Sequence, residues 1–95
     1  MGIRIKDLRA LNQLSFYGKA QVIYDDNEGS SSLYSYGTFI IKLIDGSVVQ
    51  FSEDENHYSR TTMKHLNDFL VQHGMDKTNL EEVRLSIQNG DWYDL

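Results

Sequence analysis

The sequence contains no cysteine and no proline among its 95 residues. Without cysteine the chain can form no disulfide, no thiolate metal site and no cysteine nucleophile. Without proline, no native cis-prolyl bond can slow folding. No apolar run approaches the ~18 residues that a membrane span requires, and charges interrupt the N-terminal segment too often for a secretory signal. We therefore expect a soluble, cytoplasmic protein that does not contact a membrane.

Positive charge is also scarce, because 9 Lys and Arg face 14 Asp and Glu, for a net charge of −5. The basic residues gather near the N-terminus. Residues 1–20 hold Arg4, Lys6, Arg9 and Lys19 against Asp7, which gives +4 − 1 = +3, and the remainder carries 5 − 13 = −8. An acidic body argues against sequence-independent binding to DNA or RNA, which depends on neutralising phosphates. It favours a partner with a basic surface, although solubility alone also explains it.

The length is that of one domain, since compact domains cluster around ~100–150 residues. We expect a single domain over residues 1–95, with its core in 15–88 and a tail at 91–95. In the N-terminal segment Ile5, Leu8 and either Leu11 or Leu14 follow helical spacing, which predicts a short helix over 5–13. The alternation of Ile3 with Arg4 and Ile5 is equally compatible with a strand.

Strand-forming residues dominate the next part of the chain. They predict four strands, at 17–24, 33–36, 38–44 and 47–51. The polar residues 25–32 predict a flexible hairpin loop, Gly37 indicates a bulge or a tight turn, and Asp45-Gly46 is a strong hairpin signal. Short connections of this kind join antiparallel neighbours, so we expect a four-stranded antiparallel meander.

Two helical segments follow. The first is predicted over about 59–73, with Ser59 (or Thr61 or Thr62) as the N-cap and Gly74 at its end. The second is predicted over about 79–88, introduced by a capping box that begins at Thr78. The expected fold is therefore α+β, with the main helix covering the sheet.

The sequence argues against an enzyme and against a bound metal or cofactor. His57, His65 and His73 lack the spacing of a metal site, and His65 and His73 lie ~12 Å apart along one helix. Asp68 follows His65 by one turn, but Ser59 points to another side of that helix. Ser35 or Thr38 would have to reach His65 through folding, which the sequence does not show.

Two acidic loops are the main candidates for a partner-binding surface. The first contains Asp25, Asp26 and Glu28, and the second contains Glu53, Asp54 and Glu55. Because both follow a predicted strand, they are expected at the same end of the sheet, where their carboxylates would imitate a phosphate backbone. The alternative is two ordinary solvated loops. Further candidate contact residues are Tyr58, Arg60, Trp92 and Tyr93.

Three segments together resemble a family of small uncharacterised proteins from phages and mobile elements of Gram-positive bacteria. They are SFYGKA (15–20), SYGT (35–38) and YSRTTMKHLNDFL (58–70), and the similarity covers roughly 15–74. The pattern positions in the last segment are Tyr58, Ser59, Thr61, Thr62, His65 and Phe69. The resemblance implies no role for these residues, and the SEDENH linker, the C-terminal helix and the DWYDL tail depart from the pattern.

The resemblance implies a mobile-element origin and leads to three hypotheses. The first is a non-enzymatic protein that inhibits a host defence effector, in the manner of an anti-CRISPR protein, by binding a host protein that itself binds nucleic acid. The second is a nucleic-acid-associated regulator that uses Arg4, Lys6 and Arg9, or a domain with a purely structural role. The third, a hydrolase centred on His65, is the least favoured. A monomer or small homo-oligomer is expected, in the host cytoplasm.

Overall fold

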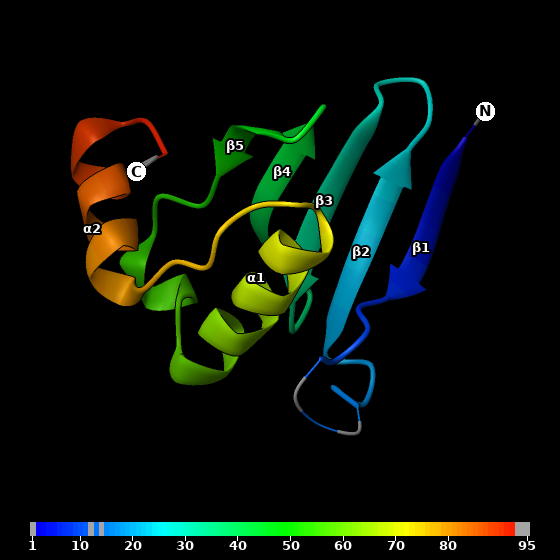
Figure 1. Cartoon of the computed structure of the whole chain (residues 1–95), viewed down its shortest axis with the longest axis horizontal. Coiled ribbons are helices and arrows are strands. Elements are labelled where there is room, and N and C mark those ends of the chain that lie inside the picture. The colour runs from blue at the N-terminus through cyan, green and yellow to red at the C-terminus, as the bar shows by residue number, and fades with distance from the viewer. Residues whose placement is uncertain (1, 12, 14, 93–95) are drawn as a thin grey trace.

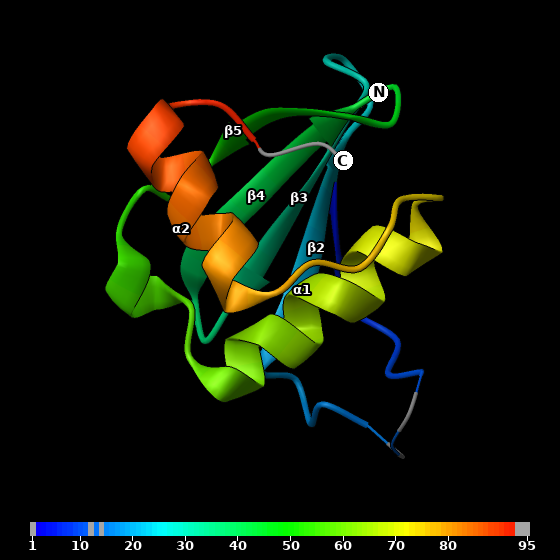
Figure 2. The same cartoon turned by 60° about the vertical axis from the view of Figure 1, so that its left-hand side comes forward.

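A computed structural model describes residues 2–11, 13 and 15–92. Five strands form one antiparallel sheet in sequence order, and both helices lie on one side of it (Figures 1 and 2). The strands are β1 (Ile3–Asp7), β2 (Ala20–Asp25), β3 (Ser30–Ser35), β4 (Thr38–Ile44) and β5 (Ser47–Phe51). A short 3-10 helix, η1 (Glu55–His57), precedes α1 (Arg60–Gln72), and α2 (Leu80–Asn89) follows. The α+β class and the antiparallel meander are confirmed.

The predicted N-terminal helix is wrong, and the sheet has five strands rather than four. Residues 3–7 form β1, in which Ile5 pairs with Ile23 of β2. Leu8 is buried just beyond the strand, and its amide donates to the Ala20 carbonyl at 2.9 Å. Leu11 is 38% exposed, so no helical apolar stripe forms. The short segment fitted both periods, and the ladder to β2 decided between them.

The connections between strands are tighter than the sequence predicted. Tyr36-Gly37 and Asp45-Gly46 both have positive φ angles, of 52° and 77° and of 52° and 75°, which is the conformation of a type I′ hairpin turn. Gly37 therefore belongs to a turn rather than a bulge. The expected flexible loop at 25–32 is wrong, because β3 begins at Ser30. The side chain of Asp25 holds the remaining turn by accepting from the Asn27 amide at 3.0 Å.

The ends of α1 were predicted correctly. Ser59 is the N-cap, and its Oγ accepts from the Thr62 amide at 3.2 Å. Gly74 has a φ of +76°, and its amide donates to the Val71 carbonyl at 3.1 Å. A left-handed residue just past the last turn satisfies otherwise unpaired carbonyls in this way.

The cap of α2 lies one residue later than predicted. Asn79 is the N-cap, and its Oδ1 accepts from the Glu82 amide at 2.9 Å. The predicted capping box from Thr78 to Glu81 is therefore wrong. Thr78 instead donates to Glu82 Oε1 at 3.3 Å, because a helix that starts at Leu80 brings Glu82 rather than Glu81 beneath it.

The core lies between α1 and the face of the sheet that it covers. Leu66, Phe69 and Leu70 of α1 pack with Leu33 and Ile41 of the sheet, and all five are at most 1% exposed. The opposite face presents the alternate positions, where Ile5, Ile23, Ser32 and Lys42 align across β1 to β4. Among the described residues no helix covers that face (Figure 2).

Neither α1 nor α2, the two α-helices in the part of the chain that the structure describes, is long and apolar enough to cross a bilayer.

Candidate functional site

The three segments that carry the resemblance meet around the imidazole of His65 on α1. Ser35, at the end of β3, has its Oγ 2.8 Å from His65 Nδ1 and 2.8 Å from Thr62 Oγ1. The ring of Phe16 lies edge-on to the imidazole, with centroids 4.5 Å apart. These contacts form because Ala20, the first residue of β2, pairs with Ser35 and brings the preceding turn beside α1.

This cluster is closed to solvent. His65 is 1% exposed, Ser35 2% and Thr62 3%. Burial lowers the pKa of His65, partly offset by the nearby carboxylate of Asp68, so the imidazole is neutral at neutral pH. A neutral ring hydrogen-bonded to a buried hydroxyl holds α1 against β3.

Folding does bring Ser35 to His65, which the sequence left open, yet the three residues do not form a catalytic arrangement. The Asp68 carboxylate accepts from the Leu11 amide at 2.9 Å, so it fixes the connection between β1 and β2. Ser35 Oγ is shared between His65 and Thr62, and a serine that is 2% exposed cannot meet a substrate. The geometry is that of a buried structural network.

Two tyrosines lie at the outer boundary of this cluster. Tyr17 and Tyr36 each precede a glycine in a tight turn, with φ angles of 53° and 52°, and they are 72% and 55% exposed. The Tyr36 amide donates to the Lys19 carbonyl at 2.7 Å, which joins the two turns. The ring of Tyr36 lies 5.7 Å from that of His65. We call these two segments, Tyr17-Gly18 and Tyr36-Gly37, the tyrosine turns.

The backbone of the tyrosine turns is strained. A left-handed conformation costs a residue with a side chain roughly 1–2 kcal/mol. Such strain persists only where the surrounding structure imposes it, and it concentrates at functional sites. Here the two residues with this conformation are tyrosines whose side chains are exposed.

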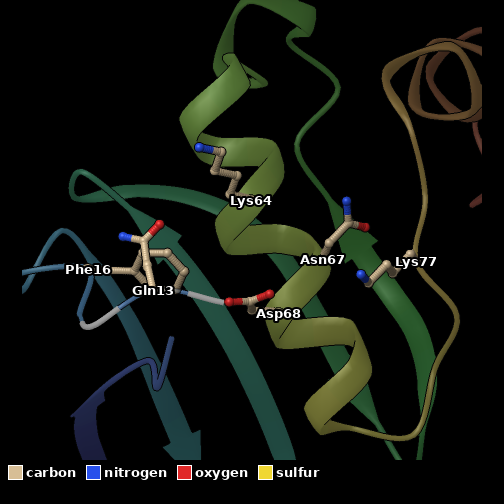
Figure 3. Close-up of a pocket in the computed structure, with 6 residues that line it drawn as sticks. All are labelled: Gln13, Phe16, Lys64, Asn67, Asp68 and Lys77. Atoms are coloured by element: carbon tan, nitrogen blue, oxygen red, sulfur yellow. The ribbon is translucent and has the colours of Figure 1, made fainter. Parts of the chain in front are cut away.

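An open pocket of about 230 Å³ is also lined by Phe16, together with residues of α1. Figure 3 shows its Asp68 side chain directed toward Gln13 and Phe16, whereas Asn67 and Lys77 lie on the other side of the helix. The polar groups do not converge on one point. Over residues 2–11, 13 and 15–92, no three His, Asp or Glu side chains gather as metal ligands.

Residues 4–85 match the model of a family of unknown function, DUF8033. The chain belongs to this family. The match confirms the expectation of an uncharacterised family and extends beyond 15–74 on both sides. No curated protein and no solved structure matches the chain.

The two acidic loops of this DUF8033 chain lie at opposite ends of the sheet, contrary to expectation. β2 and β5 run in opposite directions in the meander, so the residues that follow them lie at different ends (Figure 1). The loops therefore do not form one continuous acidic strip.

Most of these carboxylates also have local partners. Asp26 pairs with Arg4 at 3.2 Å and Glu28 with Lys42 at 2.5 Å. The Arg4 guanidinium holds the pKa of Asp26 below its usual range, and the hydrogen bond from Lys42 lowers the pKa of Glu28. Their negative charge is thus partly neutralised by the protein itself.

The second loop is similar. Glu55 pairs with Arg84 of α2. Asp54 caps η1 by accepting from the Asn56 amide at 2.9 Å. Glu53 is exposed, and the structure gives its carboxylate no hydrogen bond or ion pair among the described residues. It is the acidic candidate least used by the fold.

The remaining candidates differ in their surroundings. Tyr58 is 3% exposed, and its hydroxyl donates to the Ser52 carbonyl at 2.7 Å, so burial raises the pKa of the phenol and the residue serves the core. Arg60 is exposed at the start of α1. Trp92 packs against Phe51 with ring centroids 5.3 Å apart. Tyr93 lies outside the described residues.

The structure brings Glu53 and Trp92 together. Both line a shallow hollow of about 170 Å³ beside β5, which Asp91 also borders. Sequence reasoning proposed Glu53 and Trp92 separately but not their proximity. It did not single out Tyr17 and Tyr36 as candidates, although the glycine after each of them is the residue that most readily adopts a left-handed conformation.

Proposed function

We propose that this chain is a non-enzymatic protein-binding module of a phage or mobile element, acting on a host protein in the host cytoplasm. The observation that carries the proposal is the pair of tyrosine turns. Exposed tyrosines with few side-chain torsions to fix are frequent anchors of protein interfaces. Tyr17 and Tyr36 are also fixed at the backbone, so little conformational entropy is lost when a partner covers them.

The closed cluster beneath the turns supports binding rather than chemistry. Ser35 and His65 are buried and hydrogen-bonded to each other, so they support the surface that carries Tyr36. A rigid base with aromatic anchors is an arrangement suited to recognition.

We further propose that the partner is a nucleic-acid-binding effector of host defence, which the chain inhibits as anti-CRISPR proteins do. The resemblance and the net charge of −5 support this target. The hollow of Glu53, Asp91 and Trp92 offers carboxylates beside an aromatic ring. Such a site suits a Lys or Arg side chain from a nucleic-acid-binding surface, through an ion pair and a cation–π contact.

The test replaces both tyrosines by a residue that keeps the turns. Asparagine tolerates the left-handed conformation, so Tyr17→Asn with Tyr36→Asn should leave the urea midpoint unchanged or raised. The same double variant should lose the host protein that the parent chain captures from a Gram-positive lysate, with affinity for the purified partner reduced at least about tenfold. Asp45→Asn, in the third left-handed turn, is the matched control and should bind as the parent does.

A second arm tests the target. Glu53→Lys should weaken binding to a basic effector, whereas Asp76→Lys, an equal charge change on an exposed loop residue, should not. If the tyrosine variant binds normally, the binding surface is elsewhere. If the tyrosine variant fails to bind but Glu53→Lys does not affect binding, the proposal of a protein-binding module is supported and the proposal of a basic effector as its target is wrong.

A further inference from the structure

The edge strand β1 contributes almost nothing to the core. All five of its residues are exposed, with Ile3 at 66% and Ile5 at 61%. Figure 1 shows β1 at the outer margin of the sheet, and no helix or strand of the described residues lies beyond it. A strand with two exposed isoleucines and a free edge is a template for strand addition.

The backbone groups that face outward can be identified from the ladder. The Asp26 amide donates to the Gly2 carbonyl at 3.1 Å, and the Leu8 amide donates to the Ala20 carbonyl at 2.9 Å. In an antiparallel pair such bonds recur at every second residue, so the even-numbered residues of β1 face β2. The amides and carbonyls of Ile3, Ile5 and Asp7 therefore point away from the sheet.

The side chains of β1 are divided between the two faces of the sheet. Ile3 and Ile5 lie on the face that no helix covers, whereas Arg4 and Lys6 lie on the face of Tyr24 and Val22 with which they pair. The Arg4 guanidinium sits 5.3 Å from the Tyr24 ring centroid. An added strand would thus meet Lys6 and the Arg4 guanidinium, which also pairs with Asp26, on one face. On the other face it would meet Ile3, Ile5 and Asp7.

The charges argue against a second copy of this chain as the added strand. Two copies of β1 could pair as antiparallel strands around a two-fold axis. If the axis passes at Arg4, the two Arg4 side chains face each other, and if it passes at Lys6, the two Lys6 side chains do. If it passes at Ile5, Arg4 faces Lys6. Like charges directly opposite each other are destabilising, so these registers are disfavoured.

We propose that the β1 edge binds an extended acidic segment of a partner protein as an additional strand. The segment alternates Asp or Glu, opposite Arg4 and Lys6, with β-branched residues opposite Ile3 and Ile5. Affinity comes from backbone hydrogen bonds to the outward-facing residues of β1. Specificity comes from the side chains of β1 that the added strand meets on the two faces of the sheet. This surface is separate from the tyrosine turns, so the inference does not depend on the proposed function.

The probe is the acetylated, amidated peptide TTEVEVT, titrated into the isotope-labelled full chain and followed by NMR. The amide signals of Ile3, Ile5 and Asp7 should shift and exchange more slowly with solvent, because these amides become hydrogen-bonded. Methylating the peptide nitrogens of both valines should abolish binding, since those amides face β1. Methylating the two glutamate nitrogens, which face away, is the matched control and should be tolerated.

A charge swap tests the specificity. Arg4→Glu with Lys6→Glu should weaken the binding of TTEVEVT about tenfold or more, because two opposite-charge pairs become like-charge pairs. The same variant should gain binding of TTKVKVT, whose lysines would then face glutamates. Arg60→Glu with Lys77→Glu gives the same net charge change away from β1 and should retain the parent preference.

Several outcomes would overturn the inference. One is peptide binding that is indifferent to the position of N-methylation, or shifts confined to the helices. Another is a stable dimer in sedimentation that Arg4→Glu with Lys6→Glu alters, which would make a second copy the occupant. Preferential binding of a DNA oligonucleotide through Arg4 and Lys6 at physiological salt would likewise replace the acidic strand by nucleic acid.

Discussion

The two edges of the sheet are protected in different ways. The ladder of β5 to β4 is irregular between Lys42 and Leu43, and Gly90, Asp91 and Trp92 lie alongside the strand. β1 pairs with β2 without a shift over all five residues, and nothing described lies beyond it (Figure 1). Bulges, covering segments and charged residues are the devices by which proteins blunt sheet edges. β5 has a bulge and a covering segment, whereas β1 has only charged residues.

This difference indicates how selective each edge is. An irregular strand with a segment alongside it is a poor template for any added strand. A regular strand that carries Arg4 and Lys6 rejects positively charged strands and its own copy, but it leaves acidic segments free to bind. Charged residues thus leave a sheet edge able to bind a strand of the opposite charge, whereas a bulge disrupts the edge for every strand.

The largest expected effect is the loss of the cover on β5. Trp92→Ala should lower the free energy of unfolding by about 2 kcal/mol, because it removes a half-buried indole that packs on Phe51. Ile5→Ala on β1 should cost less than about 0.5 kcal/mol, since its side chain is exposed. Urea denaturation of both variants measures the comparison, and equal costs would show that β1 is not the less anchored edge.

An intermediate effect is expected on acidification, which acts on the centre of the sheet. The pKa of His65 is lowered by burial from an unfolded value near 6.5, so below that pH the unfolded chain binds more protons than the folded one. The contribution of the neutral His65 to the free energy of unfolding should therefore be fully present above pH 6.5 and should decline as the pH falls below that value. The urea midpoint should fall between pH 7 and pH 5.

The variant His65→Asn isolates the contribution of this one imidazole to the pH dependence. Its midpoint at pH 7 should be lower than that of the parent, but it should change less between pH 7 and pH 5. The edge pair of Arg4 and Asp26 should not contribute in this window, because its carboxyl has a folded pKa below 3.8. If the urea midpoint of His65→Asn changed with pH as much as that of the parent, the assignment of a buried neutral imidazole to His65 would be contradicted.

The smallest expected effect is at β1 itself. Arg4→Ala should move the pKa of Asp26 up toward its ordinary value of 3.8, because the neighbouring guanidinium is the largest cause of the lowering. NMR titration of the carboxyl measures the change, and added salt should shrink it because both groups are exposed. Arg84→Ala, which leaves this pair intact, should not alter the Asp26 titration.

Features encoded within a few residues were predictable from the sequence. The hairpin at Asp45-Gly46, the cap at Ser59 and the end of α1 at Gly74 each depend on local backbone geometry. The N-terminal segment was not, because five residues with Ile3 and Ile5 at alternate positions fit a strand as well as part of a helix. Only pairing with β2, which lies beyond a long connection, resolves the choice.

The candidate site depended still more on distant contacts. Ser35 and His65 are 30 residues apart, and they meet because α1 crosses the end of β3. The sequence named both residues but gave no means of joining them. The opposite placement of the acidic loops, by contrast, already followed from the predicted meander, in which two strands lie between the strands that the loops follow, so these strands run in opposite directions.

The strictly sequential order of the sheet has a consequence for synthesis on the ribosome. Each strand pairs with the one made just before it, so the sheet can grow by one hairpin at a time as the chain emerges. Its inner face, with Leu33 and Ile41, stays exposed until α1 has been translated and folds across it. The nascent sheet therefore has a brief period in which that apolar surface is not yet covered by its own helix.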